Sequence, residues 1–176
     1  MLVGQKVKLV PLEKFDLVQT QIWANDISLN ENILRVLPVT QDHQEKWYRK
    51  IVEDRTKIVF AIKNLKDDEH IGNTGFYNID WVHRRTEFWI LIGEKSYWSE
   101  GLGTECISLM LNYGFNRLNM NKIYLYVSEN NTRAVNLYKK MNFVDDGRLK
   151  QHYFIDGRYI DVLVMSILRM EFDCEK

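Results

Sequence analysis

The chain has 176 residues, of which 45% are hydrophobic, 12% aromatic and 27% charged, and its 24 basic and 24 acidic residues give a formal net charge of zero. This length suffices for one domain with a substantial core but is short for two, so we expect a single domain over residues 1–176. The balanced charge argues against a nucleic-acid partner, and the lack of an apolar run of about 20 residues argues against a membrane-spanning protein.

Apolar periodicity near the N-terminus predicts a strand followed by a helix. Residues 6–10 alternate in character and predict a first strand, which Pro11 ends. Apolar residues then recur at helical spacing over residues 14–24. Residues 25–38 are less regular, and we interpret them as a loop with a short helical piece.

A second helix is predicted directly after this loop. Thr40 has the residue type of an N-cap, and the helical pattern extends to about residue 52. Trp47, Ile51 and Val52 are the apolar residues of this helix that we expect to face inward.

The middle of the chain changes to a strand pattern. Residues 57–63, 70–79 and 86–92 are each rich in apolar residues, and polar segments separate them. We therefore predict a three-stranded meander. Gly72 and Gly75 fall inside its second strand and suggest a bend or a bulge there.

The C-terminal part alternates helices with strands. An apolar face predicts a helix over residues 103–118, followed by a strand over 122–127 and a shorter helix over 132–141. Residues 149–155 and 159–167 form a predicted hairpin. The element order is thus β-α-α-β-β-β-α-β-α-β-β, which indicates an α+β domain around a mostly antiparallel sheet.

The turn between the third meander strand and the long helix has the features of an anion-binding site. A helix N-terminus presents unpaired N–H groups and a partial positive charge. Gly101 and Gly103 let the backbone approach a phosphate closely because they carry no Cβ atom. The alternative is an ordinary strand-to-helix connection with two convenient glycines. The turn matches neither a P-loop nor a dinucleotide-binding fingerprint.

The same turn resembles the GNAT superfamily of N-acetyltransferases. That family carries a Gln/Arg-x-x-Gly-x-Gly/Ala signature between its fourth strand and third helix. The matching stretch here is Trp98-Ser99-Glu100-Gly101-Leu102-Gly103, followed by Thr104. Trp98 departs from the signature. The stretch from Tyr97 to Glu105, with its Tyr-Trp-x-x-Gly-x-Gly-Thr-Glu pattern, is similar to the branch of ribosomal-protein N-terminal acetyltransferases and spermidine acetyltransferases. The resemblance implies a GNAT fold with a twisted sheet flanked by helices. It also implies acetyl-CoA as cosubstrate, with its pyrophosphate held by the backbone of this stretch.

A second block agrees with the first. The stretch from Asn131 to Phe143 resembles the family block Asn-x-x-Ala-x-x-Leu-Tyr-x-x-x-Gly-Phe, with Asn142 in place of its glycine. The resemblance implies that Asn131 contacts the pantetheine arm or orders the loop beside it. It also implies that Tyr138 lies near the thioester sulfur, where it can protonate the departing thiolate.

The expected reaction also needs an oxyanion donor and a base. The resemblance implies that main-chain N–H groups at Ile90, Leu91 and Ile92 bind the oxygen of the tetrahedral intermediate. Glu87 is the candidate base, acting directly or through water on a protonated amine. The alternative is a surface carboxylate paired with a neighbouring arginine, Arg84 or Arg85; His83 and Asp80 are weaker candidates for the base.

No metal ligand is assigned. The histidines show no ligand spacing, and the two cysteines, Cys106 and Cys174, are too few for a cluster or a disulfide framework. The N-terminus lacks the apolar core of a signal peptide, so we expect a cytoplasmic protein. The resemblance also suggests a homo-oligomer.

The acceptor is the less determined half of the reaction. We expect a small-molecule amine, either a polyamine or an amino sugar, rather than a protein N-terminus; an antibiotic amine is a further candidate. The stretch from His43 to Trp47 resembles a His/Trp pattern of acetyltransferases that modify amino sugars, which favours an amino sugar. The first third of the chain mixes acidic with basic residues instead of forming the acidic run expected for a polycation. Its acidic residues include Asp26, Glu31, Asp42, Glu45, Glu53 and Asp54. A non-catalytic module that binds acetyl-CoA is the alternative from another class.

Overall fold

The computed structural model of the chain describes residues 1–29, 38–155 and 157–173. Its strands are β1 (Leu2–Val3), β2 (Val7–Pro11), β3 (Ile58–Asn64), β4 (His70–Asp80), β5 (Arg85–Ile92), β6 (Lys122–Ser128), β7 (Val144–Ile155) and β8 (Arg158–Leu168). Its α-helices are α1 (Leu17–Asn25), α3 (Gln41–Glu53), α4 (Leu102–Asn112), α5 (Thr132–Lys140) and α6 (Arg169–Asp173). Three shorter helical turns are η1 (Lys14–Asp16), η2 (Lys95–Tyr97) and η3 (Tyr113–Arg117).

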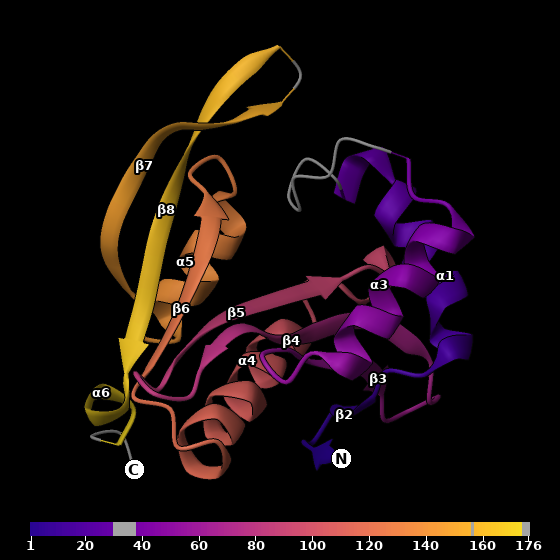
Figure 1. Ribbon diagram of the computed structural model, residues 1–176, viewed down its shortest axis with the longest axis horizontal. Coiled ribbons are helices and arrows are strands. Elements are labelled where there is room, and N and C mark those ends of the chain that lie inside the picture. The colour runs from indigo at the N-terminus through magenta and orange to yellow at the C-terminus, as the bar shows by residue number, and fades with distance from the viewer. Residues whose placement is uncertain (30–37, 156, 174–176) are drawn as a thin grey trace.

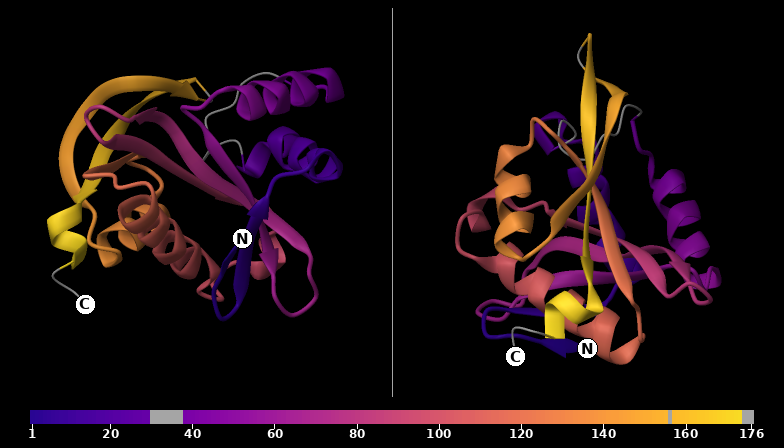
Figure 2. Two further views of the ribbon diagram at one scale, coloured as in Figure 1. Left: turned by 60° about the horizontal axis from the view of Figure 1, so that its bottom comes forward. Right: turned by 90° about the vertical axis from the view of Figure 1, so that its left-hand side faces the viewer.

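The strands form one sheet in the order β1-β2-β3-β4-β5-β6-β8-β7 (Figure 1). Every neighbouring pair is antiparallel except β5 and β6, which run parallel. The helices α1 and α3 lie on one face of the sheet, and α4 and α5 lie on the other (Figure 2). The predicted α+β fold with a mostly antiparallel, helix-flanked sheet is confirmed. The structure adds β1 and α6 at the two ends of the predicted order.

Two apolar cores follow from these layers. The larger one packs α4 and α5 against the sheet through buried residues such as Phe76, Phe88 and Phe115. The smaller one lies under α1 and α3 around Leu17 and Ala61. No described helix has both the length and the apolar character needed to cross a membrane.

The α3 helix begins as predicted but buries a different face. Thr40 is its N-cap, because the Thr40 hydroxyl accepts a hydrogen bond from His43 N at 3.3 Å. Trp47 and Ile51 pack against the smaller core, as expected. Val52 is 67% exposed, so its predicted inward orientation is wrong. Successive residues of a helix are rotated by about 100°, so Val52 does not lie on the face that Ile51 shares with Trp47.

The glycines of β4 serve close strand packing. A Cβ atom on Gly72 would lie 2.1 Å from Leu91 O, and one on Gly75 would lie 2.2 Å from Ile58 O. The register of β4 is irregular at two places. Against β3 it shifts beside Gly72, where Ile71 is the extra residue, and against β5 it shifts between Tyr77 and Asp80. The predicted bulge is therefore confirmed next to Gly72 and is wrong at Gly75, and both glycines allow the neighbouring backbones to approach.

The loop with a short helical piece that we predict for residues 25–38 lies only partly within the described residues. Residues 27–29 are helical, while residues 30–37 lie outside the described residues. The helix expected over residues 103–118 consists of α4 followed by the π-helical turn η3. The predicted hairpin is confirmed, although β7 begins at Val144 rather than at residue 149.

Candidate active site

The parallel strands β5 and β6 separate after a short paired segment. Register pairs join Arg85, Thr86 and Glu87 of β5 to β6 and go no further. Beyond them β5 pairs only with β4, while β6 continues beside β8 (Figure 1). The edge of β5 from Phe88 to Ile92 thus has no strand partner on the β6 side. The predicted oxyanion donors Ile90, Leu91 and Ile92 lie in this segment. Because successive N–H groups of a strand point to opposite sides, alternate ones face the open edge and remain available to a ligand.

The turn after β5 leads through η2 into the N-terminus of α4. Gly101 is the N-cap, with φ of 83°, and Ser99 also has a left-handed backbone with φ of 70°. Glycine takes this conformation without the steric cost that other residues incur, so Gly101 is required by the turn. The first helical hydrogen bond here runs from Glu105 N to Gly101 O at 3.2 Å. The N–H groups of Leu102, Gly103 and Thr104 therefore precede the first possible helical bond and can bind an anion.

Gly103 leaves room beside this helix end. A Cβ atom there would lie 3.5 Å from the Leu137 side chain of α5, which is an ordinary contact. The protein itself therefore tolerates a small side chain at this position. Because the first turn of α4 faces α5 here, the lack of a side chain keeps the helix end open to a bound group.

A carboxylate in the first turn of α4 holds the N-terminal strands against the turn. The Glu105 carboxylate accepts hydrogen bonds from Gln5 N, from Lys6 N at 2.9 Å and from Val7 N at 3.1 Å. An acidic residue is favourable at a helix N-terminus, which is the signal that could have identified Glu105 from the sequence. Lys6 Nζ also donates to Glu100 O at 2.8 Å. Neither contact is evident from the sequence, because 94 to 100 residues separate the partners.

Trp98 is fixed by two contacts. Its Nε1–H donates to Ile92 O at 2.9 Å, which anchors the ring at the end of β5. The guanidinium carbon of Arg133, in the first turn of α5, lies 4.8 Å from the centroid of a Trp98 ring. This cation–π contact joins α5 to the turn, and no pattern in the sequence indicates it.

Asn131 and Tyr138 lie at the start and near the end of α5. Asn131 is the N-cap, and its side chain accepts a hydrogen bond from Ala134 N at 3.1 Å. It therefore orders the loop, one of the two roles expected. Tyr138 is 8% exposed, with its ring 6.5 Å from that of Phe88 and 5.7 Å from that of Phe143. Its hydroxyl has no hydrogen-bond partner among the described residues. Burial raises the pKa of this hydroxyl, so Tyr138 stays protonated at neutral pH.

Glu87 lies on β5, on the face opposite to its neighbour Phe88, because side chains alternate along a strand. Asn78 Nδ2 donates to Glu87 Oε2 at 2.7 Å. Burial raises the pKa of the Glu87 carboxyl, and the Asn78 hydrogen bond partly opposes this shift. Carboxylates with a raised pKa cluster at functional sites.

The arginine-pairing alternative for Glu87 is wrong. Arg85 pairs with Asp80 at 3.4 Å, and Arg84 Nη1 lies 3.5 Å from Asn119 Oδ1. Asp80 Oδ2 also lies 2.8 Å from His83 Nδ1, so the two weaker candidates for the base are hydrogen-bonded to each other. These contacts hold the pKa of Asp80 at about 2, with the hydrogen bonds from His83 as the main cause.

Tyrosines surround Glu87. Tyr124 is its register partner on β6, and the Tyr124 ring meets that of Tyr126 at 5.9 Å, edge to face. The pKa values of Tyr124 and of Tyr153 on β7 are raised first by burial and then by the Glu87 charge. The alternation of residues 122–127 placed Tyr124 and Tyr126 on one strand face. Only the folded sheet shows that this face adjoins Glu87, with Tyr153 also close to it.

Most of the described acidic residues of the N-terminal region pair with a basic side chain. Asp26 binds Lys95 at 2.7 Å, Asp42 binds Lys46 at 2.6 Å, and Asp54 binds Lys57 at 2.9 Å. Glu45 lies 3.6 Å from Arg49, and Glu31 lies outside the described residues. The described acidic residues thus form the mixed surface that the sequence indicates. Among the described residues, no three metal-ligating side chains are grouped to hold an ion.

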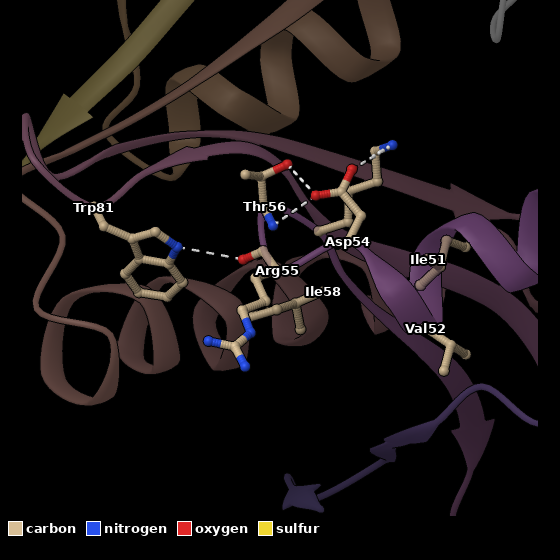
Figure 3. A pocket seen from close by; sticks show the side chains of 8 residues that line it. Ile51, Val52, Asp54, Arg55, Thr56, Ile58 and Trp81 are labelled. Atoms are coloured by element: carbon tan, nitrogen blue, oxygen red, sulfur yellow. Dashed lines mark hydrogen bonds and ion pairs between the residues drawn. The ribbon is translucent and has the colours of Figure 1, made fainter.

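A separate hollow of about 570 Å³ lies at the end of α3 (Figure 3). Trp81 Nε1 donates to Arg55 O across it at 3.3 Å, and the Asp54 carboxylate binds Thr56 beside it. None of the candidate residues lines this hollow. We therefore assign the site to the region between β5, α4 and α5 and to the adjoining Glu87 face.

Comparison with known proteins identifies the family of the chain. A family model described as an acetyltransferase (GNAT) domain matches residues 6–144. A spermidine N(1)-acetyltransferase of Escherichia coli (strain K12) is 32% identical over 172 residues, covering 98% of this chain and 91% of that protein. The crystal structure of a spermidine N-acetyltransferase from Vibrio cholerae in complex with CoA and spermine superposes with a TM-score of 0.90. The two are 31% identical, and the match covers 96% of this chain and 99% of that one. A dodecameric structure of the Vibrio cholerae enzyme has a TM-score of 0.83 at 31% identity, with 96% and 97% coverage.

Proposed function

The chain belongs to the GNAT acetyltransferase family and is an acetyl-CoA-dependent N-acetyltransferase, and we propose that its acceptor is a polyamine. The observation that carries this proposal is the similarity to spermidine acetyltransferases over nearly the whole of both chains. The Glu87 face supports it independently. A half-buried carboxylate beside tyrosine rings suits an ammonium group, which is attracted both by the charge and by the π-faces.

The donor half of the mechanism rests on backbone groups. The turn from Trp98 to Thr104 offers a left-handed glycine cap and free helix N–H groups, which suit the pyrophosphate of acetyl-CoA. The unpaired β5 edge at Ile90, Leu91 and Ile92 would direct a backbone N–H to the acetyl oxygen. Preorganised donors of this kind stabilise the oxyanion that forms when the amine attacks.

Proton transfers complete the proposed reaction. Glu87, directly or through a water molecule, takes a proton from the ammonium group, and the free amine attacks the thioester carbon. The tetrahedral intermediate then breaks its carbon–sulfur bond and loses the second nitrogen proton to solvent. Tyr138 donates its hydroxyl proton to the departing thiolate and is reprotonated from solvent. The products are the N-acetylated amine, CoA with a free thiol and one net proton.

The candidate acid and base lie on the two faces of β5. Tyr138 contacts Phe88, and Glu87 points to the opposite face. A thioester held along the open edge of β5 would lie between them. This arrangement favours direct attack within a ternary complex over a covalent acetyl-enzyme.

The amino-sugar alternative loses its sequence support. His43 accepts the Thr40 N–H in the cap of α3, and Trp47 Nε1 donates to Tyr77 Oη at 3.1 Å. Both residues of this His/Trp pattern therefore have structural roles in this chain. The pattern gives no independent reason to expect an amino sugar.

A thiol-release assay with an amine panel tests the proposal. The panel contains spermidine, spermine, a nucleotide-linked amino sugar, an aminoglycoside and a peptide with a free N-terminus. We expect kcat/KM for spermidine or spermine to exceed the other values by about a hundredfold. A larger value for the amino sugar, the aminoglycoside or the peptide would overturn the polyamine acceptor. Binding of acetyl-CoA without thiol release from any amine would favour the non-catalytic module.

We also propose that copies of the chain associate. Phe15, Val18 and Ile22, spaced at helical intervals on η1 and α1, are 69%, 68% and 56% exposed. Such an apolar stripe is typical of a contact surface, and the related Vibrio cholerae enzyme forms a dodecamer. Light scattering after gel filtration should give a multiple of the 21.1 kDa chain mass. A monomer at micromolar concentration would contradict this proposal.

A further inference from the structure

The phosphate turn contains an indole ring where the family signature has the polar side chain of glutamine or arginine. Trp98 occupies that position, and its indole N–H is already bonded to Ile92 O. Backbone N–H groups alone must therefore hold the anion unless another element supplies a cation. The structure has such an element on each side of the turn.

Arg133 supplies the first cation. Its guanidinium lies over the Trp98 ring at 4.8 Å, so the tryptophan holds it beside the turn. Arg133 is exposed, and it forms no ion pair with a carboxylate in the described part of the chain. A guanidinium held on one face by an indole still presents its N–H groups at the edge, in the fork geometry that matches a phosphate.

Lys6 supplies the second cation from the N-terminal strands. Its Nζ donates to Glu100 O at 2.8 Å and would lie 3.9 Å from a Cβ atom on Gly101. The Glu105 carboxylate fixes the backbone of this segment, so Lys6 is held beside the turn. No described carboxylate pairs with its ammonium group, which keeps at least one N–H available.

We propose that Arg133, stacked on Trp98, and Lys6 form a two-sided clamp for the phosphates of acetyl-CoA. The clamp replaces the polar residue that the signature would supply and makes the enzyme selective for CoA over phosphate-free pantetheine thioesters. This inference rests on the proposed donor site. The pantetheine and acetyl groups reach β5 and α5 without these two residues, so the clamp acts on the affinity for the donor and not on the chemical step.

The test compares two donors, acetyl-CoA and acetyl-pantetheine, with spermidine as acceptor. Arg133→Gln and Lys6→Gln should each lower kcat/KM for acetyl-CoA about tenfold, because each removes a charged contact to phosphate. Their values for acetyl-pantetheine and their kcat at saturating acetyl-CoA should stay unchanged. Trp98→Leu should lower kcat/KM for acetyl-CoA about threefold, because the guanidinium loses its support.

Lys140→Gln is the matched control. It removes one exposed positive charge from the same helix, about 10 Å from Arg133 along the axis, and should change neither donor. Calorimetry with CoA should show the same tenfold weakening for the two clamp variants and a shallower dependence on salt.

Equal losses with both donors, or no loss in either clamp variant relative to Lys140→Gln, would overturn the clamp. That outcome leaves the donor site itself intact. Failure of the proposed function would look different, because the unsubstituted protein would then neither bind CoA in calorimetry nor release thiol.

Discussion

The proposed donor side and the proposed acceptor side of the site are built in different ways. The donor side consists mainly of the backbone of one continuous turn, from Trp98 to Thr104, and of the α4 N-terminus. The acceptor side consists of side chains from separate strands, with Glu87 on β5, Asn78 on β4, Tyr124 on β6 and Tyr153 on β7. A binding site formed by backbone groups can be recognised from a short sequence motif. A ligand recognised by scattered side chains depends on how the sheet brings them together.

The largest expected effect lies where the two sides meet. Tyr138→Phe should lower kcat about a thousandfold, because the thiolate loses its proton donor. The free energy of unfolding should hardly change, because the hydroxyl makes no hydrogen bond with the described residues. Steady-state kinetics with both substrates should show unchanged KM values. Tyr113→Phe is the control. Tyr113 is a partly buried tyrosine away from the proposed site, and its ring lies 5.6 Å from that of Phe60. Equal activities in the two variants would remove Tyr138 from the mechanism.

Glu87→Gln should affect the acceptor side alone. We expect kcat/KM for the amine to fall about a hundredfold and the binding of acetyl-CoA to stay unchanged. Because burial raises the carboxyl pKa above its ordinary value of 4.5, the acidic limb of the unsubstituted enzyme should lie above that pH. Asn78→Gly should move this limb to still higher pH, because the lost hydrogen bond favoured the carboxylate. An identical pH profile for Glu87→Gln would contradict its role as base.

The same shift predicts how stability depends on pH. A carboxyl with a raised pKa stabilises the folded state in its protonated form, and this contribution is lost as the pH rises through the folded-state pKa. Relative to Glu87→Gln, the unsubstituted protein should therefore lose stability as the pH rises from below 4.5 toward neutrality. Urea unfolding of both proteins across this range measures the difference. A constant difference would show that the folded protein does not perturb this carboxyl.

Glu105→Gln should affect the donor side alone. The amide cannot accept all three backbone hydrogen bonds from residues 5–7, so the free energy of unfolding should fall by about 2 kcal/mol. The KM for acetyl-CoA should rise as Lys6 moves away from Glu100 O, and the KM for the amine should not change. Glu53→Gln, on the exposed end of α3, is the control. A rise in the amine KM would show that the two sides are coupled.

The smallest effect is expected at the helix cap. Gly101→Ala places a Cβ atom on a backbone with φ of 83°, at a cost of about 1 kcal/mol, and should also weaken acetyl-CoA binding. Gly157→Ala also places a Cβ atom on a left-handed backbone, with φ of 78° in the β7–β8 turn. This variant should be destabilised to the same extent but should bind acetyl-CoA normally. Calorimetry and thermal unfolding of the pair separate the two effects. Equal CoA affinity in both variants would mean that the turn does not contact the ligand.

The sequence by itself determined the fold class, the glycine turn before α4 and the position of Tyr138 on α5. These features depend on local rules: apolar periodicity, a glycine cap that needs a left-handed backbone, and the fixed spacing between Asn131 and Tyr138 on one helix. The structure bears out the elements behind them, while the catalytic role of Tyr138 stays a prediction.

Only the tertiary structure decided which residues surround these features. Glu105 contacts residues 5–7, Arg133 contacts Trp98, and Tyr124 is the register partner of Glu87, although 35 to 100 residues separate these partners in the sequence. It also showed that the charges near Glu87 are paired elsewhere and that Val52 faces away from the core. Periodicity shows which face of an element is apolar but not what covers it, because sheet order and strand register arise from the packing of the whole chain.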